Sequence, residues 1–345
     1  MSQANQKSNG DQQFSYTGDI SRHGDINDYL GQLIGHRFVE YRAQWEQAHS
    51  LENETKFPLY LSLETLFKCN YRCDMCIYSD PQELERVQYK ERMTDALFER
   101  IVSEAREYDC PSIGFNTVNE PLLDPDIAKR IEHAANSGFV DLRMNTNASL
   151  LTREKSSHLV DAGLVRLYVS MDAHSSETYK KVRRLGDFDK VRKNIEGFLD
   201  VRERSGQKLP ILRLSFVRLK ANEREISSFI DYWKDIADVV TIQEYMPPVI
   251  NEEYIDKQAT NRKTTKSYTC PQPYERLVIK GNGEVHPCCA QFNYKIKLGN
   301  LSNNSIYQIW NGSKMKTLRR HMKERTWDQL PICNKCIRAS YQEAD

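Results

Sequence analysis

The chain has 345 residues, of which 39% are hydrophobic and 28% are charged, and its formal net charge at pH 7 is +1. These values are typical of a globular chain with one large or two medium domains. A balanced charge gives no electrostatic reason to expect nucleic acid or an anionic membrane surface as a partner. No apolar run is long enough to span a bilayer, and the polar N-terminus does not resemble a signal peptide. We therefore expect a cytoplasmic protein.

Residues 1–24 are rich in Gln, Ser, Asn and Gly, which predicts a flexible tail. From Ile26 to Trp45, apolar residues recur at intervals of three and four, which predicts an amphipathic helix within an N-terminal segment over residues 25–56. We expect this helix to pack on the main domain. The alternative is that a side chain of the helix, Arg37, Tyr41 or Arg42, reaches a substrate.

Residues 57–250 alternate short β-rich runs with helical ones, which favours a parallel sheet with right-handed crossovers. Strands are predicted at Tyr60–Phe67, Ser112–Thr117, Val140–Asn145, Leu167–Asp172, Leu212–Val217 and Val239–Tyr245. Helices are predicted at Thr94–Tyr108, Pro125–Ser137, Arg153–Ala162, Phe188–Arg204 and Glu223–Ala237. Six strands are too few for a closed barrel of eight, so the predicted fold is α/β, a partial (β/α)6 barrel.

The first predicted strand ends in a loop that carries Cys69, Cys73 and Cys76. Three thiolates at this spacing can hold three irons of a [4Fe–4S] cluster and leave the fourth iron open for a small molecule. A structural zinc site is the alternative, but such sites are usually closed by four ligands, and this loop offers three. The spacing therefore favours a cluster.

The run CNYRCDMC around these cysteines resembles the signature of radical S-adenosylmethionine (SAM) enzymes. The resemblance implies a [4Fe–4S] cluster whose open iron binds SAM, and reductive cleavage of SAM to a 5′-deoxyadenosyl radical. It also implies a flavodoxin- or ferredoxin-type reductant and a partial barrel with ligands at the carboxyl ends of the strands. Met75 stands at the apolar position before the third cysteine.

Further SAM contacts are implied where later segments resemble family motifs. VNEPLL resembles the Gly-Gly-Glu motif that receives the SAM ammonium group, although Val118 and Asn119 replace the glycines. Arg183 matches a position whose guanidinium holds the SAM carboxylate. Ser170 and Asp172 are predicted to share one face of a strand and to face the SAM ribose or the substrate. The residues predicted to contact SAM are Met75, Asn119, Glu120, Asn145, Ser170, Asp172 and Arg183.

Gln243 and Tyr245 end the sixth predicted strand, where a ligand of a parallel sheet is expected. We predict that both contact the substrate. A polar residue at a strand end is as often structural.

Residues 260–345 are predicted to form a second, smaller domain. A strand, a Gly-Asn-Gly turn and a second short strand form a hairpin between Cys270 and Cys288, a long helix is expected over about Ser305–Lys323, and Cys333 and Cys336 follow. Four thiolates make a closed site, which suits structural zinc and a second [4Fe–4S] cluster equally well. The segment resembles the twitch or SPASM extension of radical SAM enzymes, which implies one auxiliary [4Fe–4S] cluster.

The cysteine spacings of this segment resemble those of the twitch aminocyclitol dehydrogenases, and FVEYRAQW with FPLYLSLET resembles radical SAM proteins of polysaccharide and sugar-antibiotic gene clusters. These resemblances imply an oxidoreductase that dehydrogenates a carbon bearing a hydroxyl group in a carbohydrate, an aminocyclitol or a nucleotide-sugar. A sugar-like small molecule is favoured over a peptide.

Three alternatives stay open. Cys289 is predicted to be a catalytic residue if the enzyme is an epimerase of a sugar or peptide, since an S–H group can donate a hydrogen atom to a carbon radical. Its other interpretation is a buried residue beside the cluster. A radical SAM enzyme that modifies a ribosomally made peptide is the second alternative. A zinc-stapled binding protein without catalysis is the third.

Overall fold

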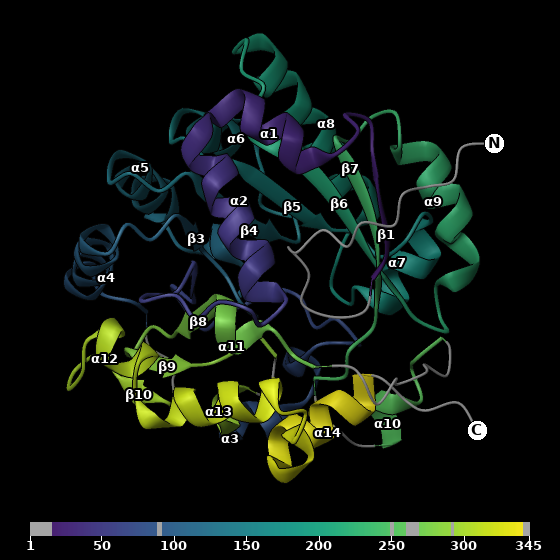
Figure 1. The fold of residues 1–345 in the computed structure, drawn as a ribbon. Coiled ribbons are helices and arrows are strands. Elements are labelled where there is room, and N and C mark those ends of the chain that lie inside the picture. The colour runs from purple at the N-terminus through teal and green to yellow at the C-terminus, as the bar shows by residue number, and fades with distance from the viewer. Residues whose placement is uncertain (1–15, 88–91, 249–251, 260–268, 291–292, 341–345) are drawn as a thin grey trace.

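The computed structural model describes residues 16–87, 92–248, 252–259, 269–290 and 293–340 (Figure 1). Ten strands form one sheet in the order β1-β7-β6-β5-β4-β3-β2-β8-β9-β10. The strands are β1 (Tyr16–Ser21), β2 (Tyr60–Leu63), β3 (Ser112–Gly114), β4 (Asp141–Thr146), β5 (Arg166–Ser170), β6 (Ile211–Arg218), β7 (Val239–Glu244), β8 (Arg276–Ile279), β9 (Glu284–His286) and β10 (Gly299–Asn300).

Strands β2 to β7 are parallel to their neighbours and follow one another in chain order. The helices α4 (Asp95–Glu107), α5 (Ile127–Asn136), α6 (Arg153–Asp161), α7 (Ser176–Val182), α8 (Phe188–Arg204) and α9 (Ile226–Trp233) lie in the crossovers between them. The predicted six-stranded α/β architecture is therefore confirmed. The strands are shorter than expected at the first two positions, where the chain leaves the sheet to form the site.

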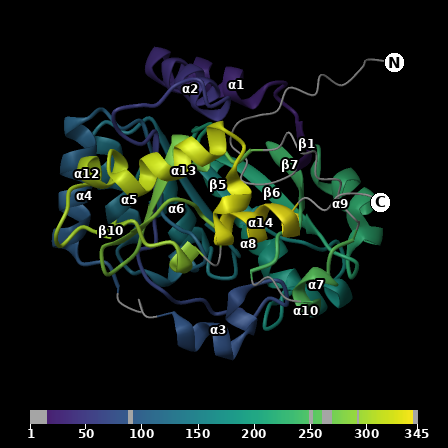
Figure 2. The same ribbon diagram turned by 60° about the horizontal axis from the view of Figure 1, so that its bottom comes forward.

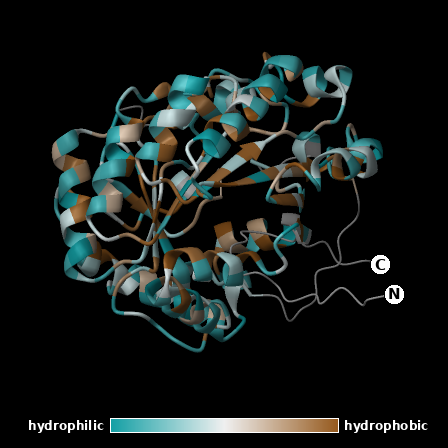
Figure 3. Ribbon diagram, turned by 90° about the horizontal axis from the view of Figure 1, so that it is seen from above, coloured by the Kyte–Doolittle hydropathy of each residue, from teal (hydrophilic) through white to brown (hydrophobic). Residues whose placement is uncertain are grey.

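The crossover helices begin where the sequence provides capping side chains. The Thr94, Thr152 and Asp187 side chains accept backbone N–H groups at the starts of α4, α6 and α8. Their apolar faces, such as Phe98 and Ile101 on α4, are buried against the sheet. Figure 3 shows the hydrophobic strands enclosed by helices whose outer faces are mostly hydrophilic.

Helices α1 (Ile26–Ile34) and α2 (His36–His49) cover the amino ends of the strands. One continuous helix was expected, but the chain breaks at Gly35, whose φ of 104° is open to glycine and costly for other residues. The Tyr41 hydroxyl accepts a hydrogen bond of 2.6 Å from Arg143 on β4. Trp45 lies beneath the Arg276 guanidinium, 5.0 Å from the ring centroid. The helix therefore packs on the barrel, as predicted.

Residues 16–21 differ from the expected flexible tail. They form β1, which pairs antiparallel with β7 at the edge of the sheet (Figure 1). The prediction of a tail over residues 1–24 is therefore wrong for this stretch. A polar run gives little local sign of a strand when its hydrogen-bond partners lie more than 200 residues further along the chain.

The C-terminal segment continues the sheet. Strand β8 lies parallel to β2, and β9 and β10 follow antiparallel, with a turn at Gly283 between β8 and β9. The predicted long helix is instead two helices, α12 (Ile306–Trp310) and α13 (Ser313–Lys323), because the backbone at Gly312 is extended. The Trp310 indole donates to Thr55 O. Figure 2 shows α13 and α14 (Pro331–Ser340) crossing in front of the barrel.

The described residues also include three short α-helices, α3 (Pro81–Arg86), α10 (Glu252–Ile255) and α11 (Gln272–Glu275), and short 3-10 turns. None of the helices that the structure describes combines the length and the apolar character needed to cross a membrane.

Candidate active site

A cavity of about 270 Å³ opens at the carboxyl ends of the parallel strands. This is the end of a parallel α/β sheet at which ligands bind. Most of the predicted site residues line it: Cys69, Cys73, Met75, Cys76, Asn119, Glu120, Asn145, Ser170, Arg183, Gln243, Tyr245 and Cys289. The structure therefore brings together residues from the first, second, third, fourth and sixth parallel strands and from the C-terminal hairpin.

The cysteine loop that follows β2 is fastened to the end of α7. Arg72 N donates to Arg184 O at 3.0 Å, and Asp74 N donates to Val182 O at 3.1 Å. Tyr71 N points at the Cys69 sulfur at 3.5 Å. These backbone contacts fix the loop before any ligand arrives, so its thiols face a preformed cavity.

Burial raises the pKa of the Cys69 thiol to about 11 and that of Cys76 to about 12. Iron–sulfur ligation uses the thiolate, so cluster binding displaces these protons. Within the described residues, no three His, Cys, Asp or Glu side chains converge as ligands of one metal ion would. A cubane cluster does not need such convergence, since each thiolate binds a different iron.

Arg183 stands between the cysteine loop and the barrel. Its guanidinium donates to the Cys73 sulfur at 3.5 Å and forms an ion pair with Asp172. The Asp172 carboxylate also accepts the backbone N–H of Val217 at 2.7 Å. Burial raises the pKa of Asp172, while the charge of Arg183 opposes that shift.

The location of Asp172 corrects the expectation that it faces SAM or substrate beside Ser170. Strand β5 ends at Ser170, and Asp172 has a φ of 58°, so the alternation of a strand no longer holds there. Ser170 lines the cavity, but Asp172 is not among the described residues that do. Asp172 instead positions the Arg183 guanidinium through their ion pair.

Glu120 is buried and accepts three hydrogen bonds. They come from the Thr146 hydroxyl at 2.6 Å, Asn147 N at 2.7 Å and Leu122 N at 3.1 Å. Burial raises the pKa of Glu120, and these donors oppose the shift. The carboxylate therefore organises the turn after β4 and caps the short turn that begins at Pro121, in addition to lining the cavity.

Three buried polar groups on cavity-lining residues have no hydrogen-bond partner among the described residues: Asn119 Nδ2, Arg183 Nε and Tyr245 Oη. An unpaired buried donor costs about 1–3 kcal/mol. SAM carries a carboxylate and ribose hydroxyls that can accept such donors. Together with three thiols in one wall, these groups fit a [4Fe–4S] cluster with bound SAM.

Several polar lining residues were not among the predicted site residues. Among them, Asn116 and Thr117 follow β3, Thr146 ends β4, and Glu244 ends β7. Asn116 Oδ1 accepts Asn145 N at 2.8 Å, and Glu244 forms an ion pair with Arg218 on β6. Their positions directly after parallel strands are the signal that could have identified them.

The C-terminal cysteines lie beside this cavity. Burial raises the pKa of Cys270, and the neighbouring Cys288 and Cys333 raise it further. The Cys336 sulfur lies 3.9 Å from the sulfur of Met246, which lines the cavity. One wall of the cavity therefore touches the group of cysteines predicted to hold the auxiliary cluster.

Cys289 is held by Gln272. Its thiol donates to Gln272 Oε1 at 3.2 Å, and its backbone N–H donates to the same oxygen at 3.0 Å. Cys289 also lines the cavity. Burial raises the pKa of its thiol to about 12, so the residue carries its S–H hydrogen at neutral pH.

Two family models match the chain. The radical SAM superfamily matches residues 63–205, and the SPASM iron–sulfur cluster-binding domain matches residues 270–337. Both cysteine groups fall within these ranges. The cofactors expected from the sequence, SAM and [4Fe–4S] clusters, are thereby confirmed, while the roles of individual residues stay predictions.

Among curated relatives, the chain is 28% identical over 202 residues to a probable GTP 3′,8-cyclase of Methanococcus maripaludis, covering 58% of this chain and 64% of that protein. The chain thus spans less than two thirds of the length of the cyclases it matches. It is 25% identical over 321 residues to a tungsten-containing aldehyde ferredoxin oxidoreductase cofactor-modifying protein of Pyrococcus furiosus, covering 80% of this chain and 86% of that protein.

Solved structures show the same fold at lower identity. BtrN in complex with AdoMet and 2-DOIA superposes with a TM-score of 0.54 at 17% identity, covering 82% of this chain and 94% of that chain. Streptococcus suis SuiB bound to the precursor peptide SuiA superposes with a TM-score of 0.54 at 16% identity, covering 81% of this chain and 70% of that chain. The superpositions show the shared fold, and the two family models show that the chain carries a radical SAM domain followed by a C-terminal SPASM iron–sulfur cluster-binding domain.

Proposed function

We propose that this enzyme dehydrogenates a hydroxyl-bearing carbon of a sugar-like small molecule: a carbohydrate, an aminocyclitol or a nucleotide-sugar. The observation that carries the proposal is the concentration of side-chain amides in the cavity. Five carboxamides line it: Asn116, Asn119, Asn145, Asn147 and Gln243.

A carboxamide presents both a donor and an acceptor, as a sugar hydroxyl does, so the two groups can pair in either direction. Some of these amides are occupied within the protein: Asn147 Nδ2 donates to Asn70 Oδ1 at 2.9 Å, and Asn116 accepts Asn145 N. Asn119 Nδ2 has no partner among the described residues, and Gln243 lies on the opposite strand β7. Asn119 Nδ2 can therefore contact SAM or substrate without breaking a bond to another described residue, and Gln243 brings a second amide from the far wall of the cavity.

The charges of the cavity favour an uncharged or amino-bearing substrate over a polyphosphate. Arg183 is the only Lys or Arg among the described lining residues. Its guanidinium already contacts the Asp172 carboxylate and the Cys73 sulfur. A triphosphate would need several cations to offset its charge. A nucleotide-sugar, which carries two phosphates, fits less well than a free sugar or aminocyclitol for the same reason.

When bound, the cofactors supply a 5′-deoxyadenosyl radical that takes a hydrogen atom from a substrate C–H, and an auxiliary cluster that accepts one electron. The remaining step is loss of the hydroxyl proton, which gives a carbonyl and completes a two-electron oxidation. Glu120 and Glu244 are the carboxylates in the described lining, and we assign the proton to Glu244, which forms an ion pair with Arg218, because three hydrogen bonds hold Glu120 in the turn after β4. Burial raises the pKa of Tyr245 well above its usual range, so Tyr245 acts as a hydrogen-bond donor to the substrate rather than as a base.

The test begins with protein purified without oxygen and reduced by dithionite in place of the flavodoxin- or ferredoxin-type reductant that we propose. Iron, sulfide and release of 5′-deoxyadenosine from SAM are measured beside a variant in which Cys69, Cys73 and Cys76 are changed to Ala. The variant should keep the auxiliary cluster and release no nucleoside. A panel of aminocyclitols, sugars and peptides is then screened by mass spectrometry for loss of two hydrogens.

Loss of two hydrogens from a polyol confirms the proposal. Modification of peptides alone contradicts the substrate class. Zinc without iron, with no SAM cleavage after reconstitution, contradicts the assignment of the cysteines.

Epimerisation is the second candidate, because Cys289 lines the cavity with its S–H hydrogen in place. In this case the Cys289 thiol gives a hydrogen atom to the substrate radical and becomes a thiyl radical, which one electron from the reductant and one solvent proton convert back to the thiol. The product gains solvent deuterium in D2O without net oxidation of the substrate. A Cys289→Ala variant separates the two reactions. It should still oxidise substrate if the enzyme is a dehydrogenase, and it should lose all product with inverted configuration if the enzyme is an epimerase.

A further inference from the structure

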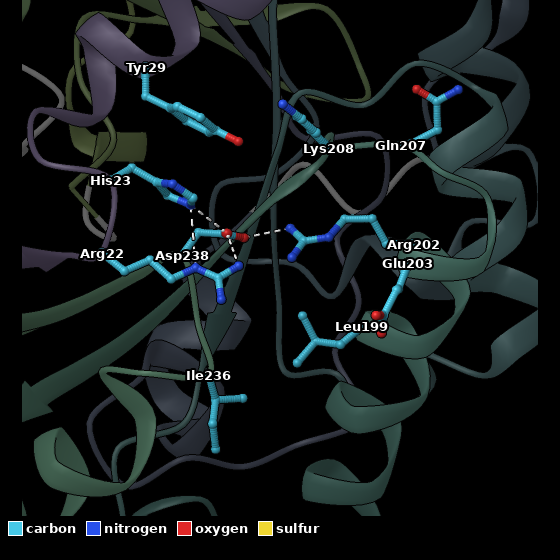
Figure 4. A pocket seen from close by; sticks show the side chains of 10 residues that line it. All are labelled: Arg22, His23, Tyr29, Leu199, Arg202, Glu203, Gln207, Lys208, Ile236 and Asp238. Atoms are coloured by element: carbon cyan, nitrogen blue, oxygen red, sulfur yellow. Dashed lines mark hydrogen bonds and ion pairs between the residues drawn. The ribbon is translucent and has the colours of Figure 1, made fainter.

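A second cavity, of about 440 Å³, lies at the other end of the parallel strands from the cysteines, and Figure 4 shows the residues that line it. Its walls are the turn between β1 and α1, the C-terminal end of α8, and the connections that lead into β6 and β7. It therefore sits at the amino ends of the strands and is separate from the SAM cavity. The lining residues are Arg22, His23, Tyr29, Leu199, Arg202, Glu203, Gln207, Lys208, Ile236 and Asp238.

A buried carboxylate anchors this cavity. The Asp238 side chain is 3% exposed and accepts hydrogen bonds from Arg22 at 2.7 Å, His23 at 2.9 Å, Leu212 N at 2.7 Å and the Arg202 guanidinium. Figure 4 shows the Arg22, His23 and Arg202 side chains converging on it from two sides. Both oxygens of Asp238 are thus already occupied by donors.

Arg22, Arg202 and Lys208 carry more N–H donors than the Asp238 carboxylate accepts. Arg22 spends one terminal nitrogen on Asp238, and Arg202 spends one on Asp238 and Pro210 O. Among the described residues, no acceptor pairs with the other terminal nitrogens of Arg22 and Arg202 or with Lys208 Nζ. Glu203 is the one further carboxylate in the described lining, and it carries no ion pair there. Two guanidinium groups and an ammonium group therefore border the cavity, and each has N–H donors without an acceptor among the described residues.

Two stacked aromatic rings form one wall of the cavity beside these charged groups. The Tyr29 and His23 rings are stacked, with centroids 4.0 Å apart and an angle of 6° between their planes. The stack holds His23 against Asp238 and brings the Tyr29 ring into the lining. Leu199 and Ile236 supply apolar surface on the other side. The cavity volume lies within the range of sites for small metabolites, and an apolar wall with a few convergent polar groups is typical of them.

We propose that this cavity binds a small metabolite through an oxyanion group, a phosphate or a carboxylate, held by Arg22, Arg202 and Lys208. Arginine and lysine are the residues that proteins use to bind these groups. The bound molecule would bridge the turn after β1 to the end of α8, and so would join the N-terminal edge strand to the barrel. The site does not depend on the reaction proposed above, since it shares no lining residue with the SAM cavity.

The test is isothermal titration of the intact, cluster-loaded protein with three probes: inorganic phosphate, glucose 6-phosphate and citrate. We expect saturable binding at one site for at least one probe, and the comparison of probes distinguishes a phosphate from a carboxylate ligand. The double variant Arg22→Gln/Lys208→Gln should bind at least about tenfold more weakly, because a hydrogen bond to a charged group is typically worth that factor or more. Both side chains are exposed, and Asp238 keeps Arg202, His23 and Leu212 N as donors, so the variant should fold.

The matched control is Lys190→Gln/Lys193→Gln, which removes the same charge from exposed positions of α8 outside the cavity. The control should bind as the native protein does, and both variants should keep their iron content and SAM cleavage. The proposal is overturned if none of the three probes binds saturably at millimolar concentration, or if the control loses affinity as much as the test variant.

Discussion

Lys280 Nζ lies 3.1 Å from Glu64 Oε2, and both side chains are almost completely buried. Glu64 follows β2 of the barrel, and Lys280 follows β8 of the C-terminal segment. The Thr117 hydroxyl, which belongs to the wall of the SAM cavity, donates to the same Glu64 oxygen. The ion pair thus fixes the hairpin of β8 and β9, called the cluster hairpin below, relative to the cavity.

Lys280→Met should destabilise the protein strongly, because it leaves the Glu64 carboxylate buried without its cation. Loss of one member of a buried ion pair typically costs about 3–5 kcal/mol of unfolding free energy. The measurement is the denaturant midpoint of anaerobically purified protein. The double variant Lys280→Met/Glu64→Gln removes both charges and should recover a large part of the loss. An equal loss in the single and double variants would show that the pair is not the cause.

Arg183→Gln should weaken SAM binding and lower the iron content. The variant loses the ion pair with Asp172 and the contact with the Cys73 sulfur, and it leaves the Asp172 carboxylate buried without its cation. The measurements are equilibrium binding of SAM and iron per chain after reconstitution.

Arg184→Gln is the matched control, since Arg184 is half exposed and its nearest carboxylate oxygen, on Asp74, lies 4.0 Å away. It should behave as the native enzyme does. Similar loss of SAM binding in both variants would mean that the charge of the segment matters rather than the position of Arg183.

Glu244→Gln should uncouple SAM cleavage from product formation. The amide keeps the shape of the side chain but cannot take the hydroxyl proton, and loss of a general base costs about 100-fold or more in rate. We expect 5′-deoxyadenosine release within a few fold of the native rate and a far lower yield of carbonyl product. Glu223→Gln, an exposed change between β6 and α9, is the control. A parallel fall of nucleoside and product would assign Glu244 to SAM binding instead.

Much of the fold could be predicted from local patterns. The alternation of β-rich and amphipathic runs gave the parallel order of β2 to β7, because each crossover helix carries its own period and its own cap, such as Thr152 before α6. Strand β1 and the break at Gly35 could not be predicted in this way. The first depends on pairing with β7, and the second on where two helices meet at the amino end of the barrel.

Some residues of the site could likewise be predicted from the sequence, and others could not. The cysteines and the residues at strand ends could be predicted because spacing along the chain places them, as it does for Cys69 and Gln243. Asp172 was misplaced because a single positive φ ends the alternation one residue after Met171. The pair Lys280–Glu64 joins residues 216 apart, so nothing in either local sequence indicates it.

Glu284 should make the cluster hairpin sensitive to acid. The His286 ring, whose Nε2 lies 3.7 Å from the Glu284 carboxylate, and the ion pair with Lys297 lower the pKa of Glu284 from 4.5 to about 2. The folded pKa is below the unfolded value, so the ionised carboxylate stabilises the fold fully above about 4.5, and this contribution is lost as the pH falls toward 2. Glu284→Gln removes the contribution at every pH. The difference in unfolding free energy between native protein and variant should therefore be constant from neutral pH down to about 4.5 and shrink below it. Denaturant titrations of both proteins in the same series of buffers measure this difference, and a gap that stays constant or widens in acid would contradict the assignment.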